Sequence, residues 1–358
     1  MKPEITALQT SIDWLEFTVM EFSIDDVLAQ ILELPRAEFS LLDKGRFGYQ
    51  RQLKWCGGNV FVMFNDTEKI QRTTDLNITG TENGNENKEK TDRMGIHVML
   101  SGTGVRDYEA RNKIRRLLLF LAVLDERVNF TRIDLAIDDF QDKIINFSRI
   151  HQYAIDHLFT SRWNKWDEVN SRKSASGEFL GRTMYFGSQT SSIFCRIYDK
   201  TLERRVNADK SVKVPEHWTR LELVYKKERA KKLVYHLIDN QTPVGVAIRG
   251  TLNQYIRFLK DPPKPDRNKS RWPSADWWNE LLAGVGKLQL TIQRKEKSID
   301  DMEEWVERQI APTIAAILTA REGDMDWLHE IISKGAQRLS QRHKDAIAQY
   351  LDRQEIKQ

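Results

Sequence analysis

The chain contains few cysteines and no long apolar run. Only Cys56 and Cys195 are present among 358 residues, too few for a disulfide framework or a zinc site. The longest apolar run, LLLFLAVL at 117–124, is too short to span a bilayer. The N-terminal stretch lacks the apolar core of a signal peptide. These absences predict a soluble, reduced, cytoplasmic protein without membrane insertion.

Positive and negative residues nearly balance over the whole chain, and the net charge is only +4. Its distribution is nevertheless uneven. Residues 226–297 hold 16 Lys and Arg against 7 Asp and Glu, and the stretch from 298 onward is acidic. A basic block in a nearly neutral chain favours a surface that faces a polyanion such as DNA. An ordinary solvated face is the alternative.

The length and the order of patterns predict two regions. A chain of 358 residues is long for a single core. Alternating strand patterns and helical patterns are interspersed up to about residue 290, and the rest is helical. We therefore expect an α+β fold with a central, largely antiparallel sheet that carries the active site and is flanked by helices. The expected domains are a catalytic domain, 1–290, and a helical C-terminal appendage, 291–358.

Several local signals place individual elements. Ser23 with Asp26 forms a capping box at a helix start, and a hairpin is expected around Gly57–Gly58. A helix is expected from about Asp107 to Leu124. Residues 77–93 form a long polar loop, and in the tail Ser298 with Asp301 begins one helix while Gly335 ends another.

Three strand patterns share an unusual polar face. In TRIDLAID the residues Arg132, Asp134 and Asp138 alternate with apolar ones, and in WTRLELV the pair Arg220 and Glu222 does the same. In FCRIYDK the polar face carries Arg196, Tyr198 and Lys200. These strands are expected to bury one face and to display acids, cations and a phenol on the other.

If these strands are neighbours, Asp134, Asp138 and Glu222 could converge within a few ångströms. Carboxylates brought together repel and need a counter-ion, and oxygen ligands suit Mg²⁺ or Mn²⁺. Surface salt bridges to Arg132, Arg196 and Arg220 are the alternative. If the strand kinks, Asp139 is an alternative to Asp138 as a metal ligand. His97 is either a further ligand, a proton acceptor or a structural residue.

Tyr198 is the candidate nucleophile of this face. A phenol, with a pKa of about 10, is a poor nucleophile at neutral pH. Arg196 and Lys200 beside it are expected to favour the phenolate, and a metal would polarise a phosphoryl group. Together these groups describe attack on a phosphodiester that leaves a phosphotyrosine. A structural tyrosine on a decorated strand is the plainer alternative.

Five motifs in order resemble the replication initiation factor family, which comprises the rolling-circle Rep proteins (Rep_trans group) and the related relaxases of integrative conjugative elements. The resemblance covers about 13–290. The motifs are DWLEFTV at 13–19, HVMLSGTGVR at 97–106, TRIDLAIDDF at 131–140, YFGSQTSSIFCRIYDK at 185–200 and WTRLELVYK at 218–226.

This resemblance implies a metal-dependent, origin-specific DNA nickase and strand transferase. The implied enzyme cuts one strand at a double-strand or transfer origin, usually beside an inverted repeat, keeps the 5′ end on tyrosine and later rejoins the strand. Tyr198 matches the family nucleophile and Lys200 the cation after it. Asp134, Asp138 and Glu222 fall where the family has strand acids. Many relatives carry a second tyrosine after this motif, whereas TLERR follows here.

Two other functions use the same residues. One is a non-catalytic initiator that melts an origin and recruits a helicase through the acidic tail. The other is a nuclease in which water attacks in place of tyrosine. A helicase and a second copy of the chain are therefore candidate partners beside the origin DNA.

Basic residues downstream of Glu222 are the candidate phosphate contacts, since phosphate contacts dominate affinity for DNA. Trp272, Trp277 and Trp278 are candidates for stacking on exposed bases, although a core role is favoured for the last two. The candidate phosphate-binding residues are Lys226, Lys227, Arg229, Lys231, Lys232, Lys264, Arg267, Lys269 and Arg271.

Overall fold

The structure is a computed structural model that describes residues 8–65, 94–207, 213–288 and 306–339, together with short runs or single residues at 290, 299, 302–303, 343–344, 346–348 and 350–351. Two compact units divide the chain, Met1–Leu290 and Thr291–Gln358. The expected loop 77–93 and the expected cap at Ser298 and Asp301 lie outside the described residues.

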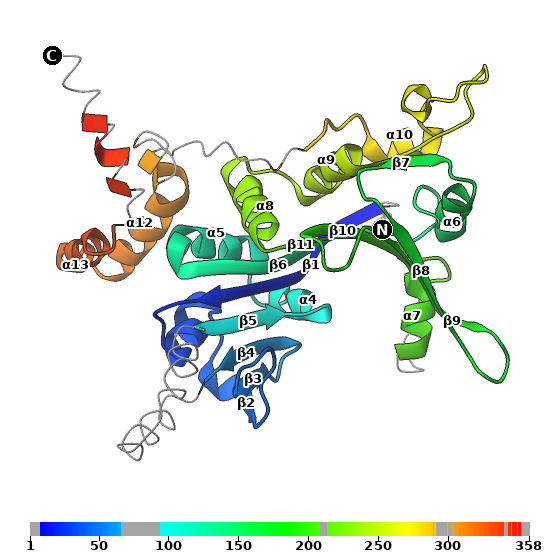
Figure 1. The fold of residues 1–358 in the computed structure, drawn as a ribbon. Coiled ribbons are helices and arrows are strands. Elements are labelled where there is room, and N and C mark those ends of the chain that lie inside the picture. Colours follow the sequence, from blue (N-terminus) through cyan, green and yellow to red (C-terminus); the bar gives the residue numbers. More distant parts are fainter. Residues whose placement is uncertain are drawn as a thin grey trace, which may run out of the picture. The chain divides into compact units, whose positions relative to one another are not determined.

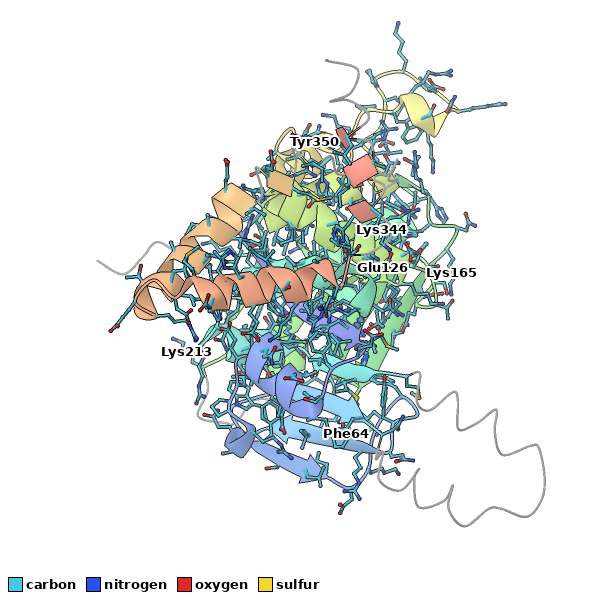
Figure 2. The ribbon with its side chains drawn as sticks, turned by 90° about the vertical axis from the view of Figure 1, so that its left-hand side faces the viewer. Phe64, Glu126, Lys165, Lys213, Lys344 and Tyr350 are labelled. Carbon is cyan, nitrogen blue, oxygen red and sulfur yellow. The ribbon has the colours of Figure 1, made fainter. Side chains whose placement is uncertain are left out.

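A ten-stranded antiparallel sheet forms the centre of the first unit, in the order β2-β3-β4-β5-β1-β6-β11-β10-β9-β8. Figure 2 labels Phe64 at the end of β4 and Lys165 just before β8, which belong to opposite halves of this sheet. The strands are β1 Leu8–Val19, β2 Phe39–Leu42, β3 Arg51–Trp55, β4 Val60–Phe64, β5 Ile96–Leu100, β6 Val128–Asp139, β8 Trp166–Arg172, β9 Phe179–Phe186, β10 Ile193–Asp199 and β11 Thr219–Lys226.

Helices cover one face of the sheet, where the apolar residues of the strands build the core. Figure 1 shows α8 and α9 above the central strands and α7 on the other side. Leu233 and Val234 of α8 pack against this face, as does Ile248 of α9. The helices are α1 Ile24–Asp26, α4 Thr103–Glu109, α5 Ile114–Leu124, α6 Phe147–Ile155, α7 Lys200–Asn207, α8 Glu228–Asp239, α9 Val244–Tyr255 and α10 Asp276–Leu282.

Short elements complete the first unit, and two longer helices belong to the second. A small sheet pairs β7 Phe159–Ser161 with β12 Ile256–Phe258. The second unit contains α12 Ala311–Ala320 and α13 Met325–Ala336. The remaining helical turns are η1 Val27–Ile31, η2 Arg36–Glu38, η4 Asp125–Arg127, η5 Lys269–Arg271 and η6 Val306–Ile310.

The fold class predicted from sequence is confirmed, and so are the capping box at Ser23 and the hairpin around Gly57–Gly58. Two helix predictions are corrected. The helix expected from Asp107 to Leu124 is two helices, since α4 ends at Glu109 and the backbone is extended at Lys113, just before α5. Gly335 does not end α13, which continues through Ala336.

Some elements gave little signal in the sequence. Strand β8 is mostly exposed at the edge of the sheet and carries few apolar residues, so it lacks a clear alternation. Strand β2 is a four-residue edge strand, and β7 has only three residues. Among the described residues, no helix combines the length and apolar character needed to cross a membrane.

Candidate active site

The three strands with polar faces are direct neighbours in the order β6-β11-β10. Glu222 of β11 lies opposite Arg196 of β10 and Ala136 of β6. One pair further along, Arg220 lies opposite Tyr198 and Asp138. The register therefore places the phenol, the acids and the arginines on one face of three adjacent strands.

This polar face is buried, which corrects the expectation that it is displayed to solvent. Asp134 and Glu222 are both 0% exposed, and Tyr198 is 9% exposed. A charge that is taken out of water is tolerated only when it is paired and hydrogen-bonded. Each acid of this face must therefore have a cationic partner within reach.

Tyr198 lies between one acid and one cation. Its hydroxyl donates a hydrogen bond of 2.5 Å to Oε1 of Glu222, and Nζ of Lys200 donates to the hydroxyl at 3.3 Å. Burial, followed by the negative charge of Glu222, raises the pKa of Tyr198 well above its usual value, and Arg220 and Arg196 only partly oppose this. The resting phenol is thus protonated, contrary to the expectation that its neighbours favour the phenolate.

Glu222 is ionised in this site. Burial works to raise the pKa of its carboxyl, but Arg196, Arg220 and the hydrogen bond from Tyr198 lower that pKa below its ordinary value. Nε of Arg196 donates to Oε2 of Glu222. The carboxylate is therefore held between a guanidinium on one oxygen and the phenol on the other.

Lys200 has an unusual environment for a lysine, because it is 7% exposed. Burial lowers the pKa of its ammonium group, the hydrogen bonds to Glu203 raise it, and Arg220 lowers it further, with a net lowering. A lysine with a lowered pKa loses and regains a proton more readily near neutral pH. Lys200 is thus suited to proton exchange beside the Tyr198 hydroxyl.

Arg220 joins three carboxylates. It makes a two-pronged pair with Asp138 at 2.6 and 2.7 Å, and its Nη1 donates to Oδ1 of Asp13 at 2.5 Å. The same nitrogen lies 3.7 Å from Oε1 of Glu222. Arg220 therefore occupies the centre of the acidic cluster that it neutralises.

Asp13 is a member of this cluster that the sequence analysis missed. The pairing of β1 with β6 shifts between Ile12 and Trp14, which leaves Asp13 as the extra residue of a bulge. Burial and Glu222 raise the pKa of Asp13 despite its pairing with Arg220. A signal existed in the sequence, because the apolar residues Ile12 and Leu15 are three positions apart in SIDWLEFTVM, which breaks strict alternation.

The expected convergence of Asp134, Asp138 and Glu222 is not found. Four residues along one strand separate the α-carbons of Asp134 and Asp138 by about 13 Å, too far for short side chains to share one ion. Arg132 takes both oxygens of Asp134 at 2.9 and 2.6 Å. In the described part of the chain, no three His, Cys, Asp or Glu side chains form a metal-binding group. These three acids as arranged do not fit a single divalent ion.

The two alternative ligands are also engaged elsewhere. Asp139 points away and accepts hydrogen bonds from the backbone nitrogens of Gln141, Ile144 and Ile145, so it shapes the loop after β6. His97 pairs with Thr18 across β5 and β1, far along the sheet from Tyr198. Neither residue joins the cluster around Arg220.

Two family models match the chain. The model for "Replication initiation factor" (Rep_trans) matches residues 128–332, and that for "Rolling Circle replication initiation protein N-terminal domain" matches residues 9–120. The first match spans more than half of the chain and includes β6, β10 and β11. This chain belongs to the replication initiation factor family.

Individual relatives agree with this membership. A protein of Bacillus subtilis (strain 168) named "Putative DNA relaxase NicK" is 24% identical over 96% of this chain and 90% of its own length. A "Replication initiation protein" of Staphylococcus aureus is 24% identical over 50% of this chain and 55% of its own. The solved rolling circle replication initiator protein from Geobacillus stearothermophilus superposes with a TM-score of 0.62 at 27% identity, covering 79% of this chain and 98% of that one.

The basic residues of this replication initiation factor are divided between the two faces of its sheet. Lys226 extends from β11 on the same face as Glu222, with Nζ donating to the carbonyl of Gln189 at 2.7 Å. Lys227 precedes α8, and Arg229, Lys231 and Lys232 lie on this helix, which packs on the apolar face. Among the candidate phosphate contacts, Lys226 alone is thus placed on the face of Tyr198.

The second basic cluster surrounds η5. Lys264 and Arg267 are exposed, Arg271 pairs with Asp266 at 2.8 Å, and Nζ of Lys269 donates to the carbonyl of His157 at 2.5 Å. This cluster precedes α10, which packs against α9 in the helical layer. These cations are therefore not part of the Tyr198 site.

Two of the three tryptophans are core residues, as the sequence analysis favoured. Trp277 and Trp278 are 8% and 1% exposed and pack around Phe258. Trp272 is partly buried, and its indole nitrogen donates to the carbonyl of Asp266 at 2.8 Å. Trp277 and Trp278 are thus not available to stack on DNA.

Proposed function

We propose that this initiator is an origin-specific nickase and strand transferase in which Tyr198 attacks one DNA strand. The origin is a plasmid double-strand origin or a transfer origin. The observation that carries the proposal is the 2.5 Å hydrogen bond from the Tyr198 hydroxyl to Glu222, inside a buried site that also contains Lys200. A phenol needs an adjacent proton acceptor to act as a nucleophile at neutral pH.

The nicking step exchanges one bond to phosphorus for another. The Tyr198 oxygen bonds to phosphorus while its proton passes to Oε1 of Glu222. The bond from phosphorus to the 3′ oxygen breaks, so the 5′ phosphate stays on Tyr198. The leaving 3′ oxygen takes a proton from Lys200, whose lowered pKa favours this transfer. Rejoining is the same sequence in reverse.

Arg196 is the cation that meets the phosphate in this proposal. Its guanidinium is partly exposed, at 27%, whereas that of Arg220 is 2% exposed. Arginine matches the geometry of phosphate oxygens with two parallel hydrogen bonds. Arg220 instead holds Asp13, Asp138 and Glu222 in place, so we assign it to positioning.

Dependence on Mg²⁺ or Mn²⁺ stays a prediction and is tested separately. The acids Asp134, Asp138 and Glu222 do not fit one ion as arranged, so no step above passes through a metal. Nicking that is lost with a chelator and restored by Mg²⁺ or Mn²⁺ would support metal dependence. Equal nicking in chelator would contradict it.

Adduct formation on 3′-labelled DNA tests the function. The protein first selects its own binding fragments from the replicon that encodes it, and these are then nicked as supercoiled and single-stranded DNA. We expect a labelled, protein-linked strand with wild type, none with Tyr198→Phe, and a normal amount with Tyr185→Phe. Tyr185 is a matched control because it lies opposite Arg196 on β9.

Three outcomes would overturn the proposal. A protein-linked strand with Tyr198→Phe would remove Tyr198 as nucleophile. Specific binding without any nicking would favour the non-catalytic initiator that melts the origin and recruits a helicase. The paired charges of the polar face give that second function its support, because an arginine matches Asp134, Asp138 and Glu222. Cleavage without a linked protein would instead indicate water as the nucleophile.

A further inference from the structure

A second feature lies on the same sheet face as Tyr198. An open cavity of about 440 Å³ is lined by Trp14 and Glu16 of β1, Arg132 of β6, Lys226 of β11, and Arg46 and Phe47 of the segment before β3. Its volume falls in the usual range of ligand pockets. None of its groups has a part in the nicking step described above, so the cavity needs an explanation of its own.

The cavity combines an exposed ring with a carboxylate oxygen. Phe47 is 63% exposed, although such rings are usually covered, and its backbone φ is +55°. One oxygen of Glu16 accepts from the Trp14 indole at 2.6 Å, and the other, Oε2, lies 3.9 Å from Nε2 of His97, beyond hydrogen-bond distance. An aromatic surface beside a carboxylate oxygen is the combination that recognises a nucleobase.

The polar atom behind the cavity is itself unsatisfied. His97 is 6% exposed, and its Nε2 has no hydrogen-bond partner among the residues that the structure describes. Its ring packs edge-on against Phe47 at 5.5 Å and nearly parallel to Tyr49 at 6.1 Å. A buried polar atom without a partner is uncommon in a folded protein and marks a place where a ligand or water completes the bonding.

Three cations surround the opening. Arg132 lies over the Trp14 ring at 4.4 Å and pairs with Asp134, and Arg46 lies over Phe61 at 4.6 Å. Lys226 completes the set. Positive groups beside an acid and aromatic rings suit a base whose flanking phosphates contact the cations.

The position of the cavity relates it to the nucleophile. On β11, Lys226 is six residues from Arg220, which lies opposite Tyr198, so the cavity is about 20 Å along the strand from the site of attack. The partly exposed guanidinium of Arg196 lies between them, and that of Arg132 lies at the cavity, opposite Lys226. A single strand that follows this line of cations passes from Tyr198 to the cavity.

We propose that the cavity binds an unpaired base of the nicked strand, a few nucleotides from the phosphodiester that Tyr198 attacks. The base stacks on Phe47 and turns a donor edge to Oε2 of Glu16, while Arg46 and Lys226 contact the flanking phosphates. This inference rests on the proposed nicking function. According to this inference, part of the sequence specificity comes from recognition of an unpaired base, separately from recognition of the duplex.

Binding of single-stranded DNA tests the inference without any nicking. The probes are fluorescent homopolymers of deoxyadenosine, deoxycytidine and thymidine, each about twelve nucleotides long. Fluorescence anisotropy at one fixed salt concentration gives the dissociation constants. We expect Phe47→Ala to weaken binding by about five- to hundredfold, the range for loss of one stacked base. Glu16→Gln should change the order of preference among the three probes.

Matched controls separate this effect from general damage. Phe120→Ala removes a 39% exposed ring from α5 in the helical layer and should leave all three dissociation constants unchanged. Phe47→Ala should fold normally, since its ring is exposed. Deoxymononucleotides should not displace the homopolymers, and displacement that depends on Phe47 would assign the cavity to free nucleotides instead.

The outcomes distinguish the two proposals. Unchanged affinity in Phe47→Ala and an unchanged probe order in Glu16→Gln would overturn the base pocket, even if Tyr198 forms its adduct. Conversely, binding that depends on Phe47 without any wild-type adduct would keep the pocket and overturn the nicking function. The Tyr198 adduct is therefore measured on the same preparations.

Discussion

Strands β6, β11 and β10 carry fully buried residues on both faces, but the two faces are opposite in chemistry. One face holds Ile137, Leu221 and Leu223 under the helices, each at most 1% exposed. The other holds Asp134, Glu222 and Arg220, which are also at most 1% exposed. The apolar face excludes water with side chains that need no particular partner, whereas each polar side chain depends on specific charged or hydrogen-bonding neighbours.

This difference predicts how each face responds to mutation. Truncating an apolar residue costs its transfer free energy plus a cavity, and the effect stays local. Removing one member of a buried charge pair leaves its partner unpaired, which costs more and affects the whole cluster. We expect one substitution on the polar face to disturb the whole charged cluster, whereas one substitution on the apolar face should reduce stability only through its own contacts.

Glu222→Gln should produce the largest effect, on chemistry. Loss of the proton acceptor should slow adduct formation by about 10²- to 10⁴-fold, because general-base catalysis contributes that much. The rate is measured with 3′-labelled origin DNA under single-turnover conditions. Leu223→Ala, one residue further on the apolar face, is the control and should retain its rate under conditions where it is folded. An unchanged rate in Glu222→Gln would remove Glu222 as the acceptor.

Arg220→Met should give the largest loss of stability. It leaves Asp13, Asp138 and Glu222 buried without their shared guanidinium, and breaking such a pair costs about 3–5 kcal/mol. Urea unfolding measures the change. The loss should shrink in acid, as the carboxylates gain protons, while the loss in Leu223→Ala, about 2–5 kcal/mol, should not. Equal pH dependence in both variants would contradict the contrast between the faces.

His97→Gln should alter the pH dependence of stability. Burial lowers the pKa of His97 to about 4, against about 6.5 in the unfolded chain. The unfolded state therefore binds the proton first, and stability falls as pH drops from about 6.5 to about 4. The full effect is at most about 3 kcal/mol. Urea unfolding at several pH values should show a shallower fall in the variant, and an identical fall would show that His97 is not responsible.

Ile137→Val should give the smallest effect, a loss of about 0.5–1.5 kcal/mol. Ile137 lies next to Asp138 in the chain but faces the helices, so adduct formation should be unchanged. Thermal or urea unfolding together with the adduct assay checks both expectations. A strong loss of nicking would mean that the two faces are coupled through the strand.

Much of this fold was predictable because strand alternation is a local property. The faces of TRIDLAID, WTRLELV and FCRIYDK follow from a period of two residues, so the sequence indicated which side chains share a face. The sequence pattern did not predict β8, because an exposed edge strand needs no alternation of apolar and polar residues. The break between α4 and α5 was not predicted because no glycine or proline marks it in the sequence; the backbone is extended at Lys113.

Within the site, the sequence by itself determined that Tyr198, Arg196 and Lys200 lie on one face, and the order of motifs indicated the family. Only the tertiary structure decided which charges meet. The register placed Glu222 opposite Ala136, the bulge in β1 brought Asp13 to Arg220, and burial raised rather than lowered the pKa of Tyr198. Register, bulges and burial depend on strands that are distant in the chain, so no local pattern could specify them.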